Sequence, residues 1–227
     1  MKRKLLETNF YGMIPPKKKS FNDFDIYEDN IPSAFLKKIK IWFGKSKEKY
    51  PRSLLGMKCW YINYMSGEKR ESEYHGCELK SEDIESKELE ITDKDYFSKI
   101  NICFQFYITY FKISTKNGEF LEFGEFDKHN EKIIGMNLED NMILFFSGYY
   151  SSIGIRAIKM KYIDRKDFIF YRIFELLRLR NIFKKDAKKK NFYLEDNNYN
   201  KLDLSMKCLL KTCLFPDTVF ASILKYL

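Results

Sequence analysis

The chain has 227 residues, a formal net charge of +9 and an aromatic content of 17%. Five cysteines without a CxxC pair argue against a disulfide-dense secreted domain and a zinc ribbon, and no run of about 20 apolar residues suits a membrane span. We expect an intracellular, cytoplasmic protein of one or two domains without membrane insertion. The positive charge fits either a lysine-rich solvated surface or a nucleic-acid partner.

Residues 1–33 combine alternating charges with single aromatic side chains and three prolines, Pro15, Pro16 and Pro32. This pattern predicts a flexible basic leader that is ordered only where an aromatic side chain docks on the body of the protein. The stretches "KRK" at 2–4 and "PPKKK" at 15–19 are typical either of a nuclear import signal or of a solvated basic tail. Nuclear localisation therefore stays an alternative.

From residue 34 onward, apolar residues recur with a period of two. In "AFLKKIKIWFG" at 34–44, one face of the expected strand carries Phe35, Ile39, Ile41 and Phe43. More short strands follow, and Asn117-Gly118 is a strong hairpin signal because its turn requires positive φ. No helical periodicity interrupts residues 34–163. We therefore predict an all-β barrel, sandwich or prism over this range.

After residue 164 the period becomes helical, as shown by the stripe of Ile169, Ile173, Leu176 and Leu177. We predict a helical C-terminal extension over residues 164–227. Near its end, Pro216 is placed to begin a short helix. The apolar stripe of that helix consists of Phe215, Val219, Ile223 and Leu224.

The β region resembles the jacalin-like lectin domain over about residues 34–163. The carrying stretches, in order, are "FLKKIKIWFG", "MKCWYINYMSGEKRESEYHGC", "KELEITDKDYFSKINICF", "ITYFKISTKNGEFLEFGEF" and "MILFFSGYYSSIGIRAIKMKY". The resemblance implies a β-prism of three four-stranded sheets. It also implies that "HGC", with His75 and Cys77, is a structural turn in which glycine eases the chain's path. A metal site there would need further ligands, and the other histidine is His129.

In the resembled family, a glycine-bounded loop before the last strand holds sugar through backbone N–H groups, an aromatic platform and one aspartate. The matching ligand-binding residues are Gly148, Tyr149, Tyr150, Ser151 and, at the position of the aspartate, Arg156. A guanidinium only donates hydrogen bonds, so it cannot replace an acceptor carboxylate. We therefore expect weak or no binding of neutral monosaccharides. Arg156 would suit an acidic sugar or a protein carboxylate, and a prism without lectin activity stays open.

The C-terminal stretch "LFPDTVFASILKYL" resembles the first helix of an F-box, and with Leu204 and Cys208 it is similar to a SOCS box. This resemblance implies partner binding through Phe215, Val219, Ile223 and Leu224 to a Skp1- or elongin-type adaptor. The alternative is a helical tail that packs on the prism.

The sequence thus predicts a non-enzymatic recognition module that binds a glycan or protein ligand through the prism loops. The alternative is a substrate-recognition adaptor of a cullin-type ubiquitin ligase or another intracellular assembly. Paired catalytic carboxylates, a triad, a phosphate loop and metal-ligand spacing are not recognisable, so we expect no enzyme, cofactor or metal. The lysine run at 184–190 is typical of a solvated loop, which makes a nucleic-acid partner the weaker interpretation.

Overall fold

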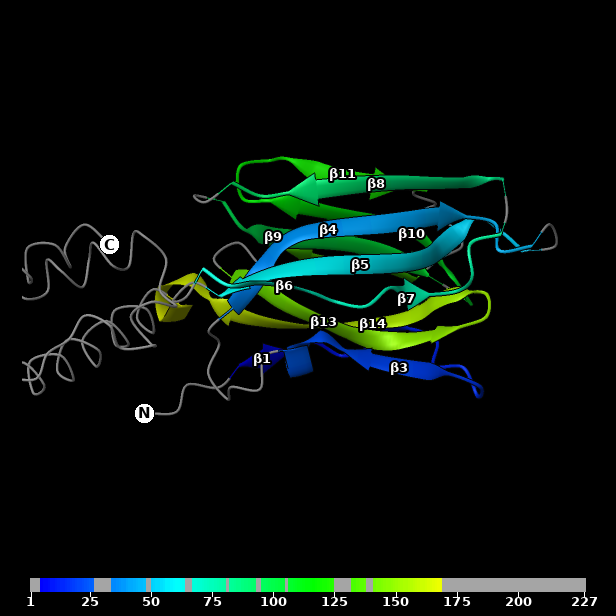
Figure 1. The fold of residues 1–227 in the computed structure, drawn as a ribbon, viewed down its shortest axis with the longest axis horizontal. Coiled ribbons are helices and arrows are strands. Elements are labelled where there is room, and N and C mark those ends of the chain that lie inside the picture. Colours follow the sequence, from blue (N-terminus) through cyan, green and yellow to red (C-terminus); the bar gives the residue numbers. More distant parts are fainter. Residues whose placement is uncertain are drawn as a thin grey trace, which may run out of the picture. The chain divides into compact units, whose positions relative to one another are not determined.

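The computed structural model describes residues 5–26, 34–47, 50–63, 67–80, 82–92, 95–104, 106–124, 132–137 and 141–168. The chain divides into two compact units, of which the first comprises residues 1–62 and 70–164. Three antiparallel sheets contain most of the described residues of this first unit (Figure 1). No helix among the described residues is long and apolar enough to cross a membrane.

Sheet A combines short strands from the beginning of the chain with the last two strands, β13 and β14. Its order is β1 (Leu6–Glu7), β14 (Gly154–Asp164), β13 (Asn141–Ser151) and β3 (Lys19–Asn22), and β2 (Tyr11–Gly12) also pairs with β14. Sheet B has the order β6 (Lys69–Glu71), β5 (Ser53–Asn63), β4 (Ala34–Gly44) and β8 (Ile84–Glu90), and β7 (His75–Gly76) also pairs with β5. Sheet C has the order β11 (Phe120–Phe123), β10 (Ile108–Thr115), β9 (Phe97–Phe104) and β12 (Lys132–Asn137).

Two of the sheets contain five strands, where four were predicted. The reason is that one edge position is filled by two short strands in succession. β1 and β2 both lie along β14, and β6 and β7 both lie along β5. Each sheet therefore has four strand positions. The predicted arrangement of three sheets holds, and in two of them one edge position is divided between two short strands.

The three sheets enclose one core. The Phe43 ring on β4 stacks on the Phe123 ring of β11 with centroids 5.4 Å apart, which joins sheets B and C. Tyr61 on β5 packs against Phe145 on β13 with centroids 5.0 Å apart, which joins sheets B and A. Sheets C and A meet where β10 contacts β14. Burial of these inner faces is the main favourable term in folding, at about 25 cal/mol per Å² of apolar surface.

The segment predicted to be a flexible leader supplies structure instead. Residues 5–26 form β1, β2, β3 and a 3₁₀ helix, η1 (Asp23–Ile26). Phe21 on β3 is buried, as is Asp23 at the start of η1. These strands are two to four residues long, which is too short for a period of two to be visible in the sequence. Pairing with β13 and β14 orders them.

The predicted strand at 34–44 is confirmed as β4, with one correction to its faces. Ile39, Ile41 and Phe43 are buried as expected, but Phe35 is half-buried. The alternation is interrupted at two consecutive half-buried residues, Lys37 and Lys38, so the buried positions before them are Ala34 and Leu36. A phase change of one residue moves a side chain to the other face of a strand.

The hairpin at Asn117-Gly118 is also confirmed. It connects β10 to β11, and Gly118 has a φ of +94°. The Gly118 N–H donates to the Thr115 carbonyl at 3.2 Å, and the Thr115 N–H donates to the Glu119 carbonyl at 2.8 Å. This turn needs glycine because a side chain rarely tolerates such a φ.

The predicted helical extension is described only at its beginning. Residues 165–168, part of the second unit, are helical. The predicted partner-binding residues lie outside the described residues: Phe215, Val219, Ile223 and Leu224. The tail and its partner therefore stay predictions.

Candidate ligand-binding site

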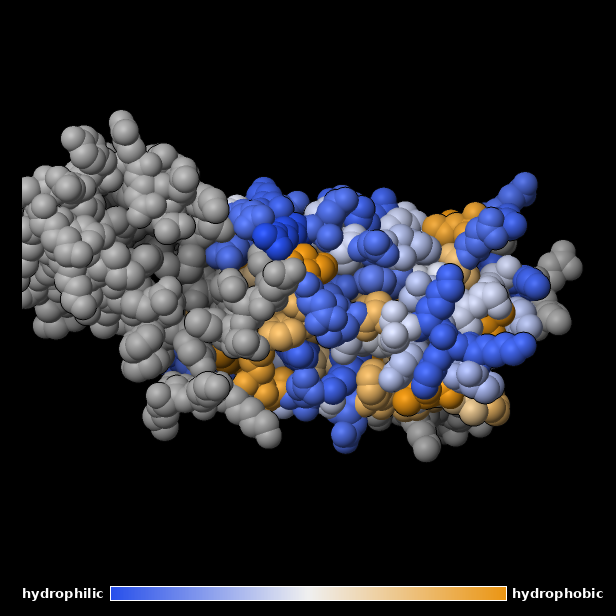
Figure 2. All heavy atoms as spheres, turned by 60° about the horizontal axis from the view of Figure 1, so that its bottom comes forward, coloured by the Kyte–Doolittle hydropathy of each residue, from blue (hydrophilic) through white to orange (hydrophobic). Residues whose placement is uncertain are grey.

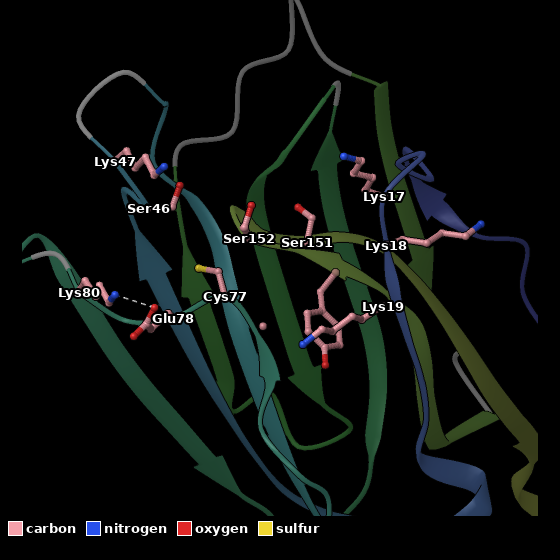
Figure 3. A pocket seen from close by; sticks show the side chains of 12 residues that line it. Lys17, Lys18, Lys19, Ser46, Lys47, Cys77, Glu78, Lys80, Ser151 and Ser152 are labelled. Atoms are coloured by element: carbon pink, nitrogen blue, oxygen red, sulfur yellow. Dashed lines mark ion pairs between the residues drawn. The ribbon is translucent and has the colours of Figure 1, made fainter.

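A cavity of about 650 Å³ opens at one end of the three sheets (Figure 3). It lies within the first unit, at the end that carries β7 and the turn between β13 and β14 (Figure 1). Four chain segments line it: the approach to β3, the loop after β4, the residues after β7, and the β13–β14 turn. The lining residues are Lys17, Lys18, Lys19, Ser46, Lys47, Gly76, Cys77, Glu78, Lys80, Tyr150, Ser151 and Ser152.

The sequence makes this end concave because strands from different sheets stop there together. β4 ends at Gly44, β13 turns back after Ser151, and β7 ends at Gly76. The segments that follow β4 and β7 carry lysines, and the turn after β13 is short; connecting segments of this kind stay at the surface, where water solvates their backbone. On the side of the molecule that carries β3, hydrophilic side chains project from this same end of the sheets (Figure 2).

The lysines of the approach to β3 alternate in direction. Lys17 and Lys19 point toward the cavity, whereas Lys18 points away (Figure 3). The Lys18 ammonium lies 4.3 Å from the centroid of the Tyr149 ring, a cation–π distance. On the opposite wall, Lys80 Nζ is 2.8 Å from Glu78 Oε2.

The two tyrosines predicted to share one platform lie on opposite faces of β13. Tyr150 lines the cavity, and its ring centroid is 6.4 Å from those of Phe21 and His75. Tyr149 lines a separate groove on the other face and packs against Phe10 with centroids 4.9 Å apart. Successive side chains of a strand alternate between faces, so the pair cannot act as one platform.

Among the other predicted ligand-binding residues, Ser151 lines the cavity and Gly148 lines the groove with Tyr149. Gly148 is packed tightly, because a Cβ at this position would lie 2.3 Å from the carbonyl oxygen of Ala157. Ser147 to Tyr150 pair with β3 on one side and β14 on the other. Paired on both sides, these backbone groups form ladder hydrogen bonds and are not free donors for a ligand.

Arg156 occupies a β-bulge. Tyr149 faces Ala157 across the ladder and Tyr150 faces Ile155, which leaves Arg156 as the extra residue between them. Its side chain is 8% exposed, and its guanidinium lies 4.7 Å from the centroid of the Tyr107 ring. Burial lowers the pKa of the Arg156 guanidinium from its ordinary value. Its Nε has no hydrogen-bond partner among the described residues.

The geometry separates Arg156 from the cavity. It is not among the described residues that line the opening, and its backbone carbonyl accepts a hydrogen bond from the Met13 N–H at 3.0 Å. The structure therefore places Arg156 beneath the aromatic ring of Tyr107, where its stem and guanidinium pack rather than project into the opening.

A buried polar cluster lies directly behind the cavity. His75 Nε2 is 2.6 Å from Asp23 Oδ1, and the Tyr61 hydroxyl donates to Asp23 Oδ2. The Phe21 ring stacks on the His75 ring at 4.2 Å. Burial raises the pKa of Tyr61 well above its ordinary value, so the phenol keeps the proton it donates. We call Asp23, His75 and Tyr61 the clasp, because they join η1 to sheet B.

The expectation that His75 serves architecture is met by the clasp, but the role of the following glycine differs from the expected turn. Gly76 lies within β7 and faces Gly56 on β5. A Cβ on Gly76 would lie 2.4 Å from the carbonyl oxygen of Leu55 and 2.6 Å from the Cα of Gly56. Glycine is required here for close approach of two backbones.

The described residues contain no group of three or more His, Cys, Asp or Glu side chains that would hold a metal ion. Cys77 lines the cavity but is 3% exposed, and burial raises the pKa of its thiol. A buried thiol with a raised pKa is a poor nucleophile.

Sequence reasoning did not find the lysines that line the cavity. Lys17 and Lys19 belong to "PPKKK", which was interpreted as an import signal or a solvated tail, and Lys47 follows β4 in a polar loop. The sequence carries no signal that joins them, since these two basic segments are about 30 residues apart and each is typical of a solvated surface.

No protein-family model and no curated protein sequence matches the chain. Solved structures do match it. Wild-type Malaysian banana lectin is 14% identical, with 71% of this chain and 99% of the lectin covered and a TM-score of 0.50. A mannose-binding jacalin-related lectin from Ananas comosus is 14% identical, with 70% and 98% covered and a TM-score of 0.50. Artocarpin, solved in complex with methyl-α-mannose, is 11% identical, with 70% and 98% covered and a TM-score of 0.51.

Identities of 11–14% establish the fold alone. The described β region has a mainly β fold that resembles the jacalin-related lectins, as predicted.

Proposed function

We propose that this protein is a non-enzymatic recognition module of lectin fold that binds a carbohydrate ligand in the cavity at the end of its sheets. The observation that carries the proposal is the cavity itself, because four separate chain segments converge on one opening of about 650 Å³. Small-molecule sites typically occupy about 300–1,000 Å³.

The lining has the chemistry that a carbohydrate needs. A sugar presents hydroxyl groups that both donate and accept hydrogen bonds, and an apolar ring face. Ser46, Ser151 and Ser152 carry hydroxyls of the same dual character. Tyr150 adds an aromatic side chain to the wall. The similar structures include lectins described as mannose-binding or solved with a mannoside, which makes carbohydrate the first ligand class to test.

Neutral monosaccharides are expected to bind weakly. The lining contains lysines, which only donate hydrogen bonds, and one glutamate, which is paired with Lys80. At the position where the resembled family has an acceptor aspartate, Arg156 is buried. A neutral sugar would therefore find few acceptors for its hydroxyl protons.

Two adjacent tyrosines provide a matched test. The full chain is applied to a glycan array, and the best glycan is then titrated by calorimetry into Tyr150→Ala and Tyr149→Ala variants. Loss of a stacking aromatic side chain from the cavity is expected to weaken binding about tenfold. Tyr149→Ala should leave affinity unchanged, since that ring lies on the other face.

Melting temperatures of both variants control for folding. Binding that depends on Tyr149 and not on Tyr150 would move the site to the groove. A chain that binds no glycan on the array would refute the carbohydrate function.

The absence of an enzyme mechanism is part of the proposal. In the described part of the chain, Cys59 and Cys77 are buried thiols with raised pKa values, and the hydrogen-bonded pair of Asp23 and His75 is buried behind the cavity. These groups are held by packing rather than exposed to a substrate.

An adaptor function stays the alternative, and it depends on the tail. If Phe215, Val219, Ile223 and Leu224 dock in a partner's groove, Ile223→Asp should abolish co-purification of that partner, because burying one such side chain contributes about 1.5–3 kcal/mol. The melting temperature should stay unchanged. A large fall in melting temperature with the same partners retained would instead make the tail part of the folded core.

A further inference from the structure

We infer that the cavity takes an anionic sugar, one that carries a phosphate or sulfate monoester, attracted by the positive charge of Lys17, Lys19 and Lys47. The inference rests on the carbohydrate function proposed above and specifies its ligand class. It is carried by three features of the cavity: its charge, an unpartnered buried hydroxyl and the geometry of its donors.

The charge of the lining is strongly positive. Among the described residues that form it there are five lysines and one glutamate, so the formal charge is 5 − 1 = +4. Two of the lysines are already engaged, Lys80 with Glu78 at 2.8 Å and Lys18 with the Tyr149 ring at 4.3 Å. Lys17, Lys19 and Lys47 remain, and none of them pairs with a carboxylate among the described residues.

These three ammonium groups come from two sides of the opening. Lys17 and Lys19 extend from the approach to β3, and Lys47 extends from the loop after β4 (Figure 3). Like charges that converge on one concave surface repel one another and raise the local positive potential. An anion bound between them removes that repulsion, which gives the cavity a preference for negative charge.

A second, independent feature points to the same place. The Ser46 Oγ is buried and has no hydrogen-bond partner among the described residues. Buried hydroxyls are almost always paired, so the Ser46 hydroxyl keeps a hydrogen-bonding capacity that no described residue uses. Ser46 lies beside Lys47, while Ser151 and Ser152 lie across the opening (Figure 3). The Ser151 Oγ accepts from the Ile153 N–H at 3.4 Å, which leaves its own proton to donate.

The donor set suits a tetrahedral oxyanion. Phosphate and sulfate esters have several acceptor oxygens directed around one centre, and ammonium and hydroxyl groups donate from several directions. An arginine fork binds a carboxylate or a phosphate through two parallel hydrogen bonds, and Arg156 does not line this opening. The ring of Tyr150 provides the wall for the sugar itself, so the ester and the ring are recognised by different residues.

The test begins with the full chain on an array in which each glycan is present with and without its ester. Calorimetry then uses mannose 6-phosphate, mannose 6-sulfate, mannose and inorganic phosphate as probes. We expect both esters to bind at least about tenfold more tightly than mannose and than inorganic phosphate. The difference between the two esters identifies which oxyanion the cavity prefers. Affinity should fall steeply from about 50 to about 300 mM salt, because the lysines are exposed and screened.

The variant Lys19→Gln/Lys47→Gln removes two of the three unpaired charges, and Lys99→Gln on β9 is the matched exposed control. Each exposed charge interaction is worth up to about fivefold in affinity, so the double variant should lose about tenfold for the esters while the control loses nothing. Ser46→Ala is a second variant, which leaves the charge of the lining unchanged, and its affinity for the esters should fall about threefold.

The outcomes separate the two proposals. Equal binding of neutral and esterified glycans, or an unchanged affinity in the double variant and in Ser46→Ala, overturns the anionic ligand and leaves the carbohydrate function intact. Inorganic phosphate bound as tightly as the esters shows an unselective anion site and also overturns it. No glycan bound in any form overturns the carbohydrate function and, with it, this inference.

Discussion

The clasp and the cavity share two chain segments, the one that contains β3 and η1 and the one that contains β7, but their charged groups differ in burial and pairing. Asp23 and His75 face each other behind the cavity, whereas Lys19 and Cys77 line it only a few residues away. In the clasp, a buried carboxylate has a partner on each oxygen. In the cavity, Lys17, Lys19 and Lys47 are exposed and have no carboxylate partner among the described residues.

Burial explains the difference. A charge removed from water loses its hydration, so a buried charge persists only when hydrogen bonds or an opposite charge replace the water. An exposed lysine keeps its hydration and can stay unpaired at little cost. Paired buried groups therefore maintain the fold, and unpaired exposed groups are available to a ligand. The predictions below test this separation.

The largest effect is expected in the clasp. Asp23→Ala removes the hydrogen-bond partner of His75 Nε2 and one partner of the Tyr61 hydroxyl, and an unsatisfied buried group costs about 1–3 kcal/mol. We expect the free energy of unfolding to fall by about 3 kcal/mol in urea denaturation.

Asp25→Ala is the control for that variant. Asp25 belongs to the same 3₁₀ helix but is exposed, and among the described residues it accepts a hydrogen bond from Asn22 Nδ2 at 2.8 Å. Its loss should stay within about 0.5 kcal/mol. If both variants lose equally little, the clasp contributes nothing to stability and the contrast with the cavity is wrong.

A smaller effect is expected at Arg156, which combines burial with an unpartnered Nε. Replacement of such a group by an apolar side chain of similar length is often neutral or stabilising. Arg156→Met should therefore change the free energy of unfolding by less than about 1 kcal/mol, with the lost contact to Tyr107 offset by relief of desolvation.

Titration of the same variant with the best glycan sharpens the comparison. Unchanged affinity is the expected result, because Arg156 does not line the cavity. If the affinity for the glycan falls tenfold or more while the stability is unchanged, Arg156 belongs to the ligand site.

The smallest effect concerns a paired charge at the surface. Glu122 on β11 accepts from Lys112 Nζ at 2.8 Å and from the Tyr110 hydroxyl at 2.6 Å, and these contacts, with Lys112 the larger, lower its pKa. A lowered pKa stabilises the fold fully above the ordinary value of 4.5, and that contribution is lost as pH falls through the folded-state pKa. Glu122→Gln should thus cost about 0.5 kcal/mol at neutral pH.

Unfolding curves of both proteins from neutral pH downward check this prediction. The wild-type and variant stabilities should converge in strongly acidic solution, where the glutamate is protonated. A difference that is independent of pH would assign the effect to packing instead of charge.

Some of the fold was predictable because its signals are local. β4 is a long strand with alternating apolar residues, and the β10–β11 hairpin carries a defined turn signal. Both lie where the sequence predicted them. The strands of residues 5–26 were missed for the opposite reason. They are two to four residues long, and their order comes from pairing with β13 and β14, which are more than 100 residues away in the chain.

The candidate site was partly predictable. Tyr150 and Ser151 line the cavity, but Tyr149 and Arg156 do not. The register shift between Tyr149 and Tyr150 makes Arg156 a bulged residue, and such a bulge depends on the partner strand. The lysines of the opening come from segments that the sequence describes only as polar.

The amino-acid sequence by itself predicted β-strands within residues 34–163, because alternating apolar residues and turn residues are signals that involve only a few neighbouring positions. Tertiary structure decided which of those strands share edges with residues 5–26, and it alone brought Lys17, Lys19 and Lys47 to one opening. It also decided that His75 would meet Asp23 rather than a ligand. The physical reason is that burial and charge pairing depend on distances in space, which the order of residues does not fix.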